Sequence, residues 1–229
     1  KVSFIPAPFR PFFLKFREEY LKVGGSPHNY IHQDMAGSLR EAFRAEGDNT
    51  TRFHMAFLDS DPRPDEAVIR ALNEGANKVA FATVFVTVSS HTKAGQDMVK
   101  ELDLDKYGVP ICFSEPLWDS ETLQGMFVAR ANDHLNGTDK SKVGILLVGH
   151  GQPEDWDKVY PTQTEQEILF RRSIVDRLTA DGYAKENISL AWMEFKQPEI
   201  RAVAQELAGK GVEKLFVFAT SISASSLHS

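Results

Sequence analysis

The feature that most constrains the fold is an alternation of short apolar runs with amphipathic segments. Six runs rich in β-branched and aromatic residues have the length of buried strands: Phe53–Leu58, Lys78–Val88, Val109–Phe113, Val143–Val148, Ile188–Met193 and Lys214–Thr220. Between them, apolar residues recur at helical spacing, as in Ile200, Val203, Ala204 and Leu207, or Met35, Leu39, Ala42 and Phe43. Alternating strands and helices predict a layered α/β fold with parallel sheets, whose sites lie at the carboxyl ends of strands.

An internal repeat predicts that this fold consists of two similar lobes. The stretch that starts at Ala56 can be laid on the stretch that starts at Ala191. The alignment matches two prolines and two glycines, namely Pro62 with Pro198 and Gly75 with Gly211. Any two strand–helix–strand units resemble each other, but matched polar residues favour a true duplication. The polar stretch Asn136–Ser141 then separates an N-terminal lobe, 1–136, from a C-terminal lobe, 141–229.

Composition narrows the classes of function that the chain can have. The 229 residues are 42% hydrophobic and 25% charged, which is typical of a folded globular protein. A net charge of −6 without a basic stripe argues against a nucleic-acid partner. The single cysteine, Cys112, excludes an intrachain disulfide and a cysteine-built metal centre. No apolar run approaches the roughly 18 residues of a membrane helix, and the first residues lack a signal-peptide pattern. We therefore expect a cytoplasmic protein without an integral membrane segment.

Candidate catalytic residues follow three of the predicted strands. The run Val143–Val148 leads directly into Gly149-His150-Gly151, the next strand ends at Glu194, and the last ends near His228. The flanking glycines would let a ligand approach His150 closely. Imidazole and carboxylate groups bind first-row divalent metals, and an imidazole also accepts protons near neutral pH.

The three residues together predict catalysis by His150 and Glu194 and a metal site formed by His150, Glu194 and His228. Each residue also has a plainer interpretation. His150 could be satisfied by backbone partners in a tight turn, Glu194 could be a solvated charge, and His228 could belong to a frayed chain end.

Aromatic residues near these positions are candidates for stacking on a planar ligand, although such residues are more often core: Trp156, Trp192 and Phe195. His91 is the repeat counterpart of His228, and it either lines the opposite side of the site or is a solvated strand-end histidine. Three acidic residues after His150 are best explained as partners of a helix dipole: Glu154, Asp155 and Asp157.

These residues resemble motifs of the ferrochelatase and cobaltochelatase superfamily, the class II chelatases. The stretch after the catalytic histidine is similar to the ferrochelatase pattern through His150, Pro153, Tyr160, Pro161 and Gln163. Upstream, a Tyr-x-x-x-Gly-Gly-Ser-Pro element is matched by Tyr20, Gly24, Gly25, Ser26 and Pro27. The likeness extends over most of the chain.

The resemblance implies a lyase of porphyrin and heme biosynthesis that inserts a divalent metal into a tetrapyrrole bound between two flavodoxin-like lobes. His150 would remove pyrrole protons and bind the metal, Glu194 would balance charge and pass protons outward, and His228 would complete the metal site. Substrate contacts would come from Trp156, Tyr160, Trp192 and His91. No organic cofactor is expected, and the metal is a substrate, with Fe²⁺ ahead of Co²⁺ or Ni²⁺.

Departures from the family pattern keep other functions open. The segment after Glu194 lacks the Gly-Pro and Trp-Leu-x-Pro residues of ferrochelatases and looks more like that of cobalt or nickel chelatases, which act on sirohydrochlorin. Pro6-Ala7-Pro8 stands where the repeat would place a second Gly-His-Gly, as expected for a non-catalytic carrier of metal or haem. A regulatory flavodoxin-like module is a third possibility, because a fold alone does not fix a function. The sequence carries no signal of the oligomeric state.

Overall fold

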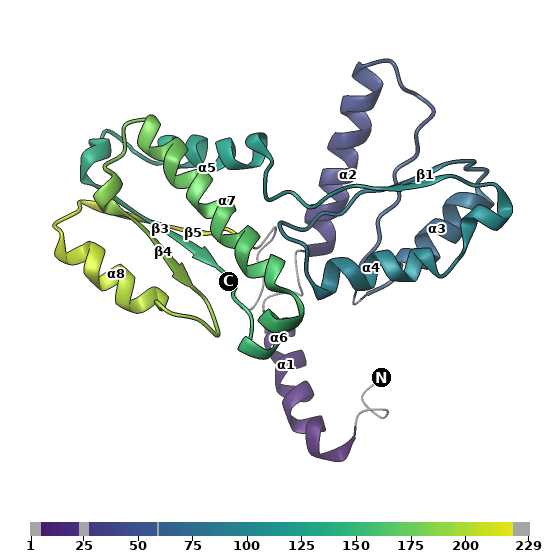
Figure 1. Ribbon diagram of the computed structural model, residues 1–229, viewed down its shortest axis with the longest axis horizontal. Helices are drawn as coiled ribbons and strands as arrows, with labels where there is room; N and C mark the ends of the chain where they lie inside the picture. Colours follow the sequence, from purple (N-terminus) through teal and green to yellow (C-terminus); the bar gives the residue numbers. More distant parts are fainter. Residues whose placement is uncertain (1–5, 23–27, 59, 222–229) are drawn as a thin grey trace. The chain divides into compact units, whose positions relative to one another are not determined.

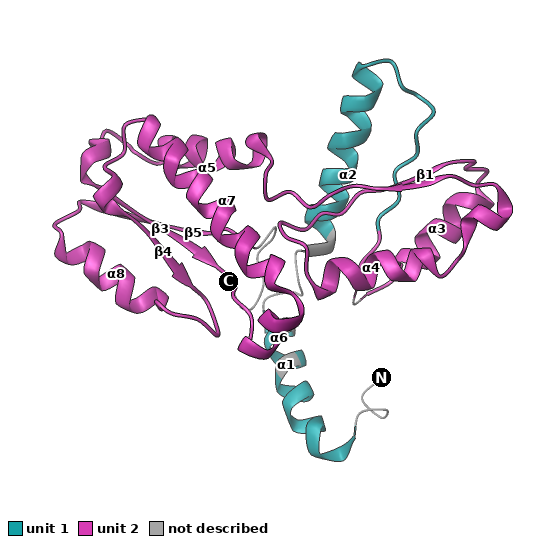
Figure 2. Ribbon diagram, in the orientation of Figure 1, with its two compact units in different colours: residues 1–55, 222–229 teal, residues 56–221 magenta. Residues whose placement is uncertain are grey.

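The computed structural model describes residues 6–22, 28–58 and 60–221 (Figure 1). Residues 56–221 form one compact unit, and the described residues before 56 belong to a second one (Figure 2). The smaller unit contains the short 3₁₀-helix η2 (Ala7–Phe9) and the helices α1 (Arg10–Lys22) and α2 (His28–Ala45). The first strand predicted at Val2–Ile5 and the family element at 24–27 lie outside the described residues.

Helix α2 is confirmed, but the stripe of apolar residues predicted as its inner face is exposed. Met35, Leu39 and Phe43 are all among the exposed large hydrophobic side chains. The ring of Phe43 packs edge-on against Phe53, with 5.0 Å between centroids. The strand predicted at Phe53–Leu58 is wrong, because these residues have no regular secondary structure.

The larger unit contains the remaining elements in the order expected for an α/β protein. They are α3 (Pro64–Asn73), β1 (Val79–Phe81), α4 (Ser90–Lys100), η3 (Leu104–Tyr107), β2 (Ile111–Phe113), α5 (Glu121–Asp133), η4 (Lys140–Lys142), β3 (Val143–Gly149), α6 (Glu154–Val159), α7 (Pro161–Ala180), η5 (Lys185–Asn187), β4 (Ile188–Trp192), α8 (Ile200–Gly209) and β5 (Lys214–Ala219).

The strands form two parallel sheets, as the alternation predicts. Strands β1 and β2 pair in parallel, with Ala80 opposite Cys112. The second sheet has the order β4-β3-β5, with both neighbours parallel to the central strand β3. Helices flank both sheets, so the predicted α/β fold with two parallel sheets is confirmed. The strand expected over Lys78–Val88 is much shorter, since only β1 is regular within that range.

Strand β3 is the centre of the larger sheet's core, and all seven of its residues are buried. Its side chains alternate between two apolar clusters. On one face Ile145 and Leu147 pack with α7 through Phe170 and Ile174. On the other face a second cluster joins the sheet to α8, through Leu146, Val148, Ala191, Val203 and Leu207. Burial on both faces explains why the β3 sequence is continuously apolar rather than alternating.

The internal repeat is visible in the backbone of the larger unit. The amide of Phe57 donates to the carbonyl of Pro62 at 2.9 Å, and the amide of Trp192 donates to the carbonyl of Pro198 at 3.0 Å. A helix follows each proline, namely α3 and α8. Each helix leads to a glycine in the left-handed region, with φ of 93° at Gly75 and 78° at Gly211. Strands β1 and β5 come next, so the two segments share their order of elements from the proline onward, although only the second begins with a regular strand, β4.

The polar stretch 136–141 forms the connection between the elements of the two predicted lobes. Helix α5 ends at Asp133, and Asn136 and Gly137 adopt positive φ angles of 47° and 82° before η4 begins. These turn residues lie where the sequence placed a boundary. The division into lobes 1–136 and 141–229 stays a prediction.

Candidate active site

His150 lies immediately after β3, and backbone hydrogen bonds place it beside Glu194. The amide of Met193 donates to the carbonyl of Gly149 at 2.8 Å, and the amide of Glu194 donates to the carbonyl of His150 at 3.1 Å. These bonds continue the pairing of β3 with β4 beyond the last regular residues. The side chains of His150 and Glu194 are both exposed. The structure therefore brings these two predicted catalytic residues onto neighbouring turns at one edge of the sheet.

The imidazole of His150 is fixed by its own turn. Its Nδ1 atom lies 2.7 Å from the carbonyl oxygen of Gly151. A carbonyl oxygen only accepts, so Nδ1 must carry the hydrogen of this bond. In the neutral ring Nε2 then keeps its lone pair, because a neutral imidazole has one protonated nitrogen. The geometry thus leaves Nε2 as the atom that can accept a proton or bind a metal.

The glycines on either side of His150 are required by the protein itself. A Cβ atom on Gly149 would lie 2.6 Å from Oε2 of Glu167 and 2.7 Å from Cζ of Arg171. Gly151 has a φ of 80°, and its Cβ would lie 2.3 Å from the carbonyl oxygen of Glu194. Protein atoms therefore leave no room for a Cβ atom at either position. These contacts account for both glycines without a ligand, and the expectation that the glycines let a ligand approach His150 stays a prediction.

Two buried charged residues of α7 lie under the His150 turn. Oε2 of Glu167 accepts from the amide of His150 at 2.8 Å and from the amide of Gly151 at 3.4 Å. The guanidinium of Arg171 donates through Nη1 to the carbonyl of Ala191 at 2.7 Å and lies 3.9 Å from the ring centroid of Trp192. Glu167 is 4% exposed and Arg171 is 1% exposed.

Sequence reasoning missed Glu167 and Arg171, although a signal was present. Both residues fall on the buried stripe of α7 at helical spacing with Phe170, Ile174 and Leu178. Charged residues on an apolar stripe are rarely buried unless they are paired or hydrogen-bonded. Their positions could therefore have marked them as partners of the preceding strand end.

A second polar cluster joins α6 to the loop after β4. Oδ1 of Asp157 accepts from Gln152 Nε2 at 2.7 Å and from Thr164 Oγ1 at 2.6 Å, while Oδ2 pairs with the ammonium group of Lys196. Burial acts to raise the pKa of Asp157, but the hydrogen bonds from Lys196, Thr164 and Gln152 outweigh it and hold the pKa below its usual value. Asp157 is thus a link between four segments rather than only a partner of a helix dipole.

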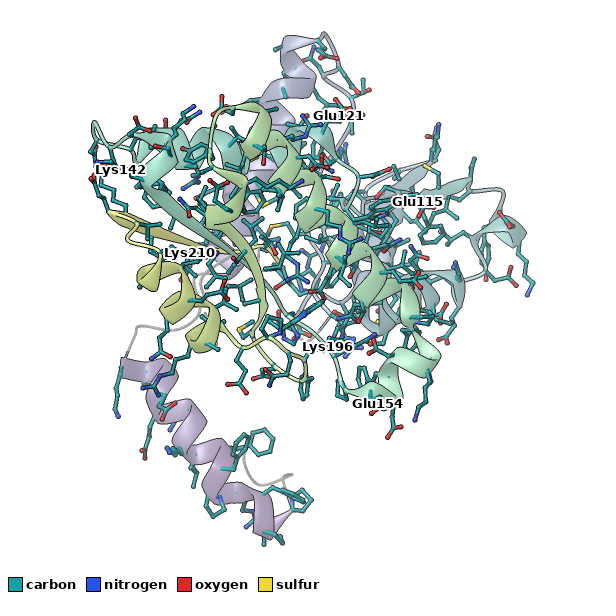
Figure 3. The ribbon with its side chains drawn as sticks, turned by 60° about the vertical axis from the view of Figure 1, so that its left-hand side comes forward. Glu115, Glu121, Lys142, Glu154, Lys196 and Lys210 are labelled. Carbon is teal, nitrogen blue, oxygen red and sulfur yellow. The ribbon has the colours of Figure 1, made fainter. Side chains whose placement is uncertain are left out.

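The two acids that precede Asp157 on α6 are exposed. Glu154, which is labelled with Lys196 in Figure 3, and Asp155 lie in the first turn of this helix. Their position agrees with the predicted interaction with the helix dipole.

The residues predicted to contact a substrate differ in exposure. Trp156 on α6 is 48% exposed, and Phe195, next to Glu194, is 59% exposed with a φ of 64°. Tyr160 is half-buried between α6 and α7, where its carbonyl accepts from Gln152 Nε2 at 2.8 Å. Trp192 is buried, and the contacts of its ring with Arg171 are those of a core residue.

His91 is exposed in the first turn of α4, and its ring stacks with Phe85 at 6.5 Å between centroids. The loop before it is attached to α7. Gln166 Oε1 accepts from the amide of Val88 at 2.7 Å, and Thr162 Oγ1 donates to the carbonyl of Val88 at 3.3 Å. The helix that carries Glu167 therefore also holds the loop that leads to His91.

His228 lies outside the described residues. In the part of the chain that the structure describes, no three His, Cys, Asp or Glu side chains form a group that could hold a metal ion. The complete set of His150, Glu194 and His228 therefore stays a prediction. Within the described residues, no helix is both long and apolar enough to span a membrane.

Comparison with known proteins finds structures of similar fold. Two similar solved structures are SirB from Bacillus subtilis with Fe³⁺ and the sirohydrochlorin chelatase SirB from Bacillus subtilis subspecies spizizenii in complex with cobalt. The first has a TM-score of 0.63 and 16% identity over 86% of this chain and 73% of that chain. The second has a TM-score of 0.51 and 13% identity over 82% of both chains. These likenesses show a shared chelatase-like fold.

A search of curated protein sequences finds no match to this chain. The model of the ferrochelatase family, by contrast, matches residues 2–227, which is almost the whole chain. The chain therefore belongs to the ferrochelatase family.

Proposed function

We propose that this protein is a chelatase that inserts a divalent metal into a porphyrin or a related tetrapyrrole, with His150 as base and metal ligand. Family membership supports the coarser part of this proposal, a metal chelatase that acts on a tetrapyrrole. One observation carries the assignment of His150. Its Nδ1 is bonded to the Gly151 carbonyl at 2.7 Å, so the neutral ring of an exposed residue presents a free Nε2.

The chemistry of metal insertion suits such a group. A free tetrapyrrole loses two inner N–H protons as one divalent metal enters, so the balanced reaction releases two protons. An imidazole near neutral pKa accepts one proton at a time and passes it on. Glu194 lies on the adjoining turn and is exposed, so its carboxylate can balance the charge of the metal and relay protons to water. His228 is proposed as a further metal ligand.

The macrocycle needs an apolar surface next to His150. Trp156 and Phe195 are the exposed aromatic residues on the segments that flank it, and we assign the stacking contacts to them. Tyr160 and His91 are proposed as further substrate contacts. Trp192 is buried, with Arg171 over its ring. It would support the His150 turn and would not contact the macrocycle.

The metal proposed first is Fe²⁺. Of the two similar solved structures, one is SirB with Fe³⁺ and the other is in complex with cobalt, so they support both branches of the family. A cobalt or nickel chelatase acting on sirohydrochlorin is the second candidate. It is favoured by the segment after Glu194 and by the name of the cobalt-bound relative.

Metal insertion by the purified protein tests the function directly. Protoporphyrin and sirohydrochlorin are each incubated with Fe²⁺, Co²⁺ or Ni²⁺, and the visible spectrum is followed. We expect turnover with at least one pair. His150→Ala should lower kcat on the order of a hundredfold or more, the effect of removing a positioned base.

His134→Ala is the matched control, because Nδ1 of His134 also bonds a backbone carbonyl, that of Arg130 at 2.9 Å, but at the end of α5. Its kcat should equal that of the unmodified protein. Undiminished turnover in His150→Ala would refute the assignment. Tight binding of a tetrapyrrole without product would instead favour a non-catalytic carrier.

A further inference from the structure

We propose that Glu167 is a positioning residue that holds the Gly149-His150-Gly151 turn so that His150 keeps its hydrogen on Nδ1 and its lone pair on Nε2. The effect of this role on turnover rests on the proposed function. The structural part does not, because it concerns the turn alone. Glu167 acts through the main chain and is not itself a base or a ligand in this proposal.

Glu167 contacts the turn directly through its carboxylate. One carboxylate oxygen, Oε2, accepts from two successive amides, those of His150 at 2.8 Å and Gly151 at 3.4 Å. Hydrogen bonds to an ionised acceptor are stronger than neutral ones, and burial strengthens them further. The peptide groups on both sides of the His150 Cα atom are thereby fixed to α7.

Glu167 itself has little freedom, because it is buried beside Arg171. Nε of Arg171 donates to the backbone carbonyl of Glu167 at 3.1 Å, and Nη1 donates to Ala191 on β4 at 2.7 Å. Burial lowers the pKa of Arg171 to about 10, while the carboxylate of Glu167 opposes this shift, so the guanidinium is charged at neutral pH. A buried carboxylate needs such a nearby cation and hydrogen-bond donors, because an isolated one is costly.

The turn also holds the imidazole, through the carbonyl of Gly151. In a neutral histidine, the hydrogen bond made by one ring nitrogen determines which of the two nitrogens is protonated. Here the acceptor is the carbonyl of Gly151, whose amide Glu167 holds. The carbonyl oxygen of Glu194 lies so close to Gly151 that only glycine fits at this position. A shift of this turn would move the Gly151 carbonyl away from Nδ1. The Nδ1–H tautomer would then no longer be favoured by a hydrogen bond.

The test is nitrogen-15 NMR of the histidine side chains without metal or tetrapyrrole, at a pH where His150 is neutral. His150→Ala identifies the signals of His150. We expect the Nδ1–H form in the unmodified protein and a mixture of both forms in Glu167→Gln, which keeps the shape but loses the charge. Turnover should fall roughly 10-fold to 100-fold, as for other residues that orient a ligand, with KM for the tetrapyrrole nearly unchanged.

Glu165→Gln is the matched control, since Glu165 is exposed on the same helix and loses the same charge. It should leave both the tautomer and the turnover unchanged. If circular dichroism shows that Glu167→Gln does not fold, the same spectra are recorded for the double variant Glu167→Gln/Arg171→Gln, which removes both buried charges. An unaltered Nδ1–H form in the folded variant would overturn the proposal.

The two proposals fail in different ways. A tautomer that depends on Glu167 in a protein without any metal insertion would contradict the proposed function and leave the positioning role intact. Full insertion activity, with a His150 tautomer that does not change in Glu167→Gln, would support the proposed function and overturn the positioning role.

Discussion

Gly151 shows how narrowly a single position of the site is defined. Its φ of 80° lies in the left-handed region, and its missing Cβ atom would meet the carbonyl oxygen of Glu194 at 2.3 Å. The first condition disfavours any L side chain, and the second disfavours any side chain whatever its conformation. The turn of His150 and the turn of Glu194 can therefore lie this close together only because residue 151 is glycine.

We expect Gly151→Ala to lower the free energy of unfolding by roughly 1–3 kcal/mol, because the turn must either strain or move. It should also reduce metal insertion, since the imidazole is bonded to the carbonyl of residue 151. Urea denaturation and the insertion assay measure the two effects. Gly209→Ala, at the end of α8 with open space around its Cβ position, is the control and should leave both nearly unchanged. Equal stability of the two variants would contradict the prediction.

At the residue scale the sequence predicted neighbours but not the reasons for them. His150 and Glu194 were expected together because they follow two strands of one parallel sheet, and backbone bonds confirm that placement. The role of Gly149 could not be read in the same way. The side chains that exclude a Cβ atom there, Glu167 and Arg171, lie a helix away in sequence, and only packing brings them back.

Among the elements, the short helix α6 is joined to the loop after β4 by the Asp157–Lys196 ion pair. Asp157 and Lys196 are 24% and 20% exposed, and Asp157 also accepts from Gln152 and Thr164. The pKa of Asp157 is lower in the folded protein than in an unfolded chain. Its contribution to stability is therefore present above the unfolded pKa and is lost as the pH falls through the folded pKa.

We expect Asp157→Asn to lower the free energy of unfolding in a way that depends on pH. At pH 6 the variant should be less stable than the unmodified protein by about 1–2 kcal/mol, the cost of a weakened charge-assisted network. The difference should shrink as the pH is lowered below about 4, where the carboxylate of an unfolded chain is protonated. Urea denaturation at a series of pH values measures it. Asp155→Asn is the control, because the Asp155–Lys158 pair is well exposed and of small expected value. A difference in the free energy of unfolding between Asp157→Asn and the unmodified protein that stays constant with pH would contradict this prediction.

Strand lengths were the least predictable property of the elements. The run Lys78–Val88 has strand composition, yet β1 ends at Phe81, opposite the last residue of β2. In the described structure no strand pairs with the chain beyond that point. Phe85 accepts there from the amide of Leu117, and Val88 is bonded to side chains of α7. Composition reveals the tendency to be extended, but pairing depends on a partner of matching length.

At the scale of the larger unit, the two sheets differ greatly in how well they are supported. Strand β3 is buried throughout and has a partner on both sides, whereas β1 and β2 are three-residue strands that pair only with each other in the described structure. Local openings in a protein occur where buried apolar contacts and hydrogen bonds are few. We expect the sheet of β1 and β2 to open before the sheet around β3.

Native-state hydrogen exchange followed by NMR measures this difference. Amides of β3 should exchange on the order of a hundredfold more slowly than those of β1, which pairs with β2 alone. Under mild denaturant the amides of β1 and β2 should form one cooperative group that opens at lower free energy. Identical opening energies for β1 and β3 would mean that both sheets unfold as one body.

The global fold was well predicted because it depends on repeated, local signals. The alternation of strands and helices gave the parallel sheets, and the matched Pro62 and Pro198 gave the recurring backbone connection. The exposure of the apolar stripe on α2 was not predictable, since a stripe shows that a helix can pack without showing what it packs against.

The packing of Glu167 and Arg171 on Gly149 also bears on how the protein could be re-engineered. Random libraries aimed at a new metal preference would vary the residues around His150, and many members would fail for reasons unrelated to the metal. A side chain at 149 collides with two buried charges, so it becomes acceptable only together with smaller partners on α7. Productive libraries should therefore keep positions 149, 151, 167 and 171 constant, or vary them jointly as one block.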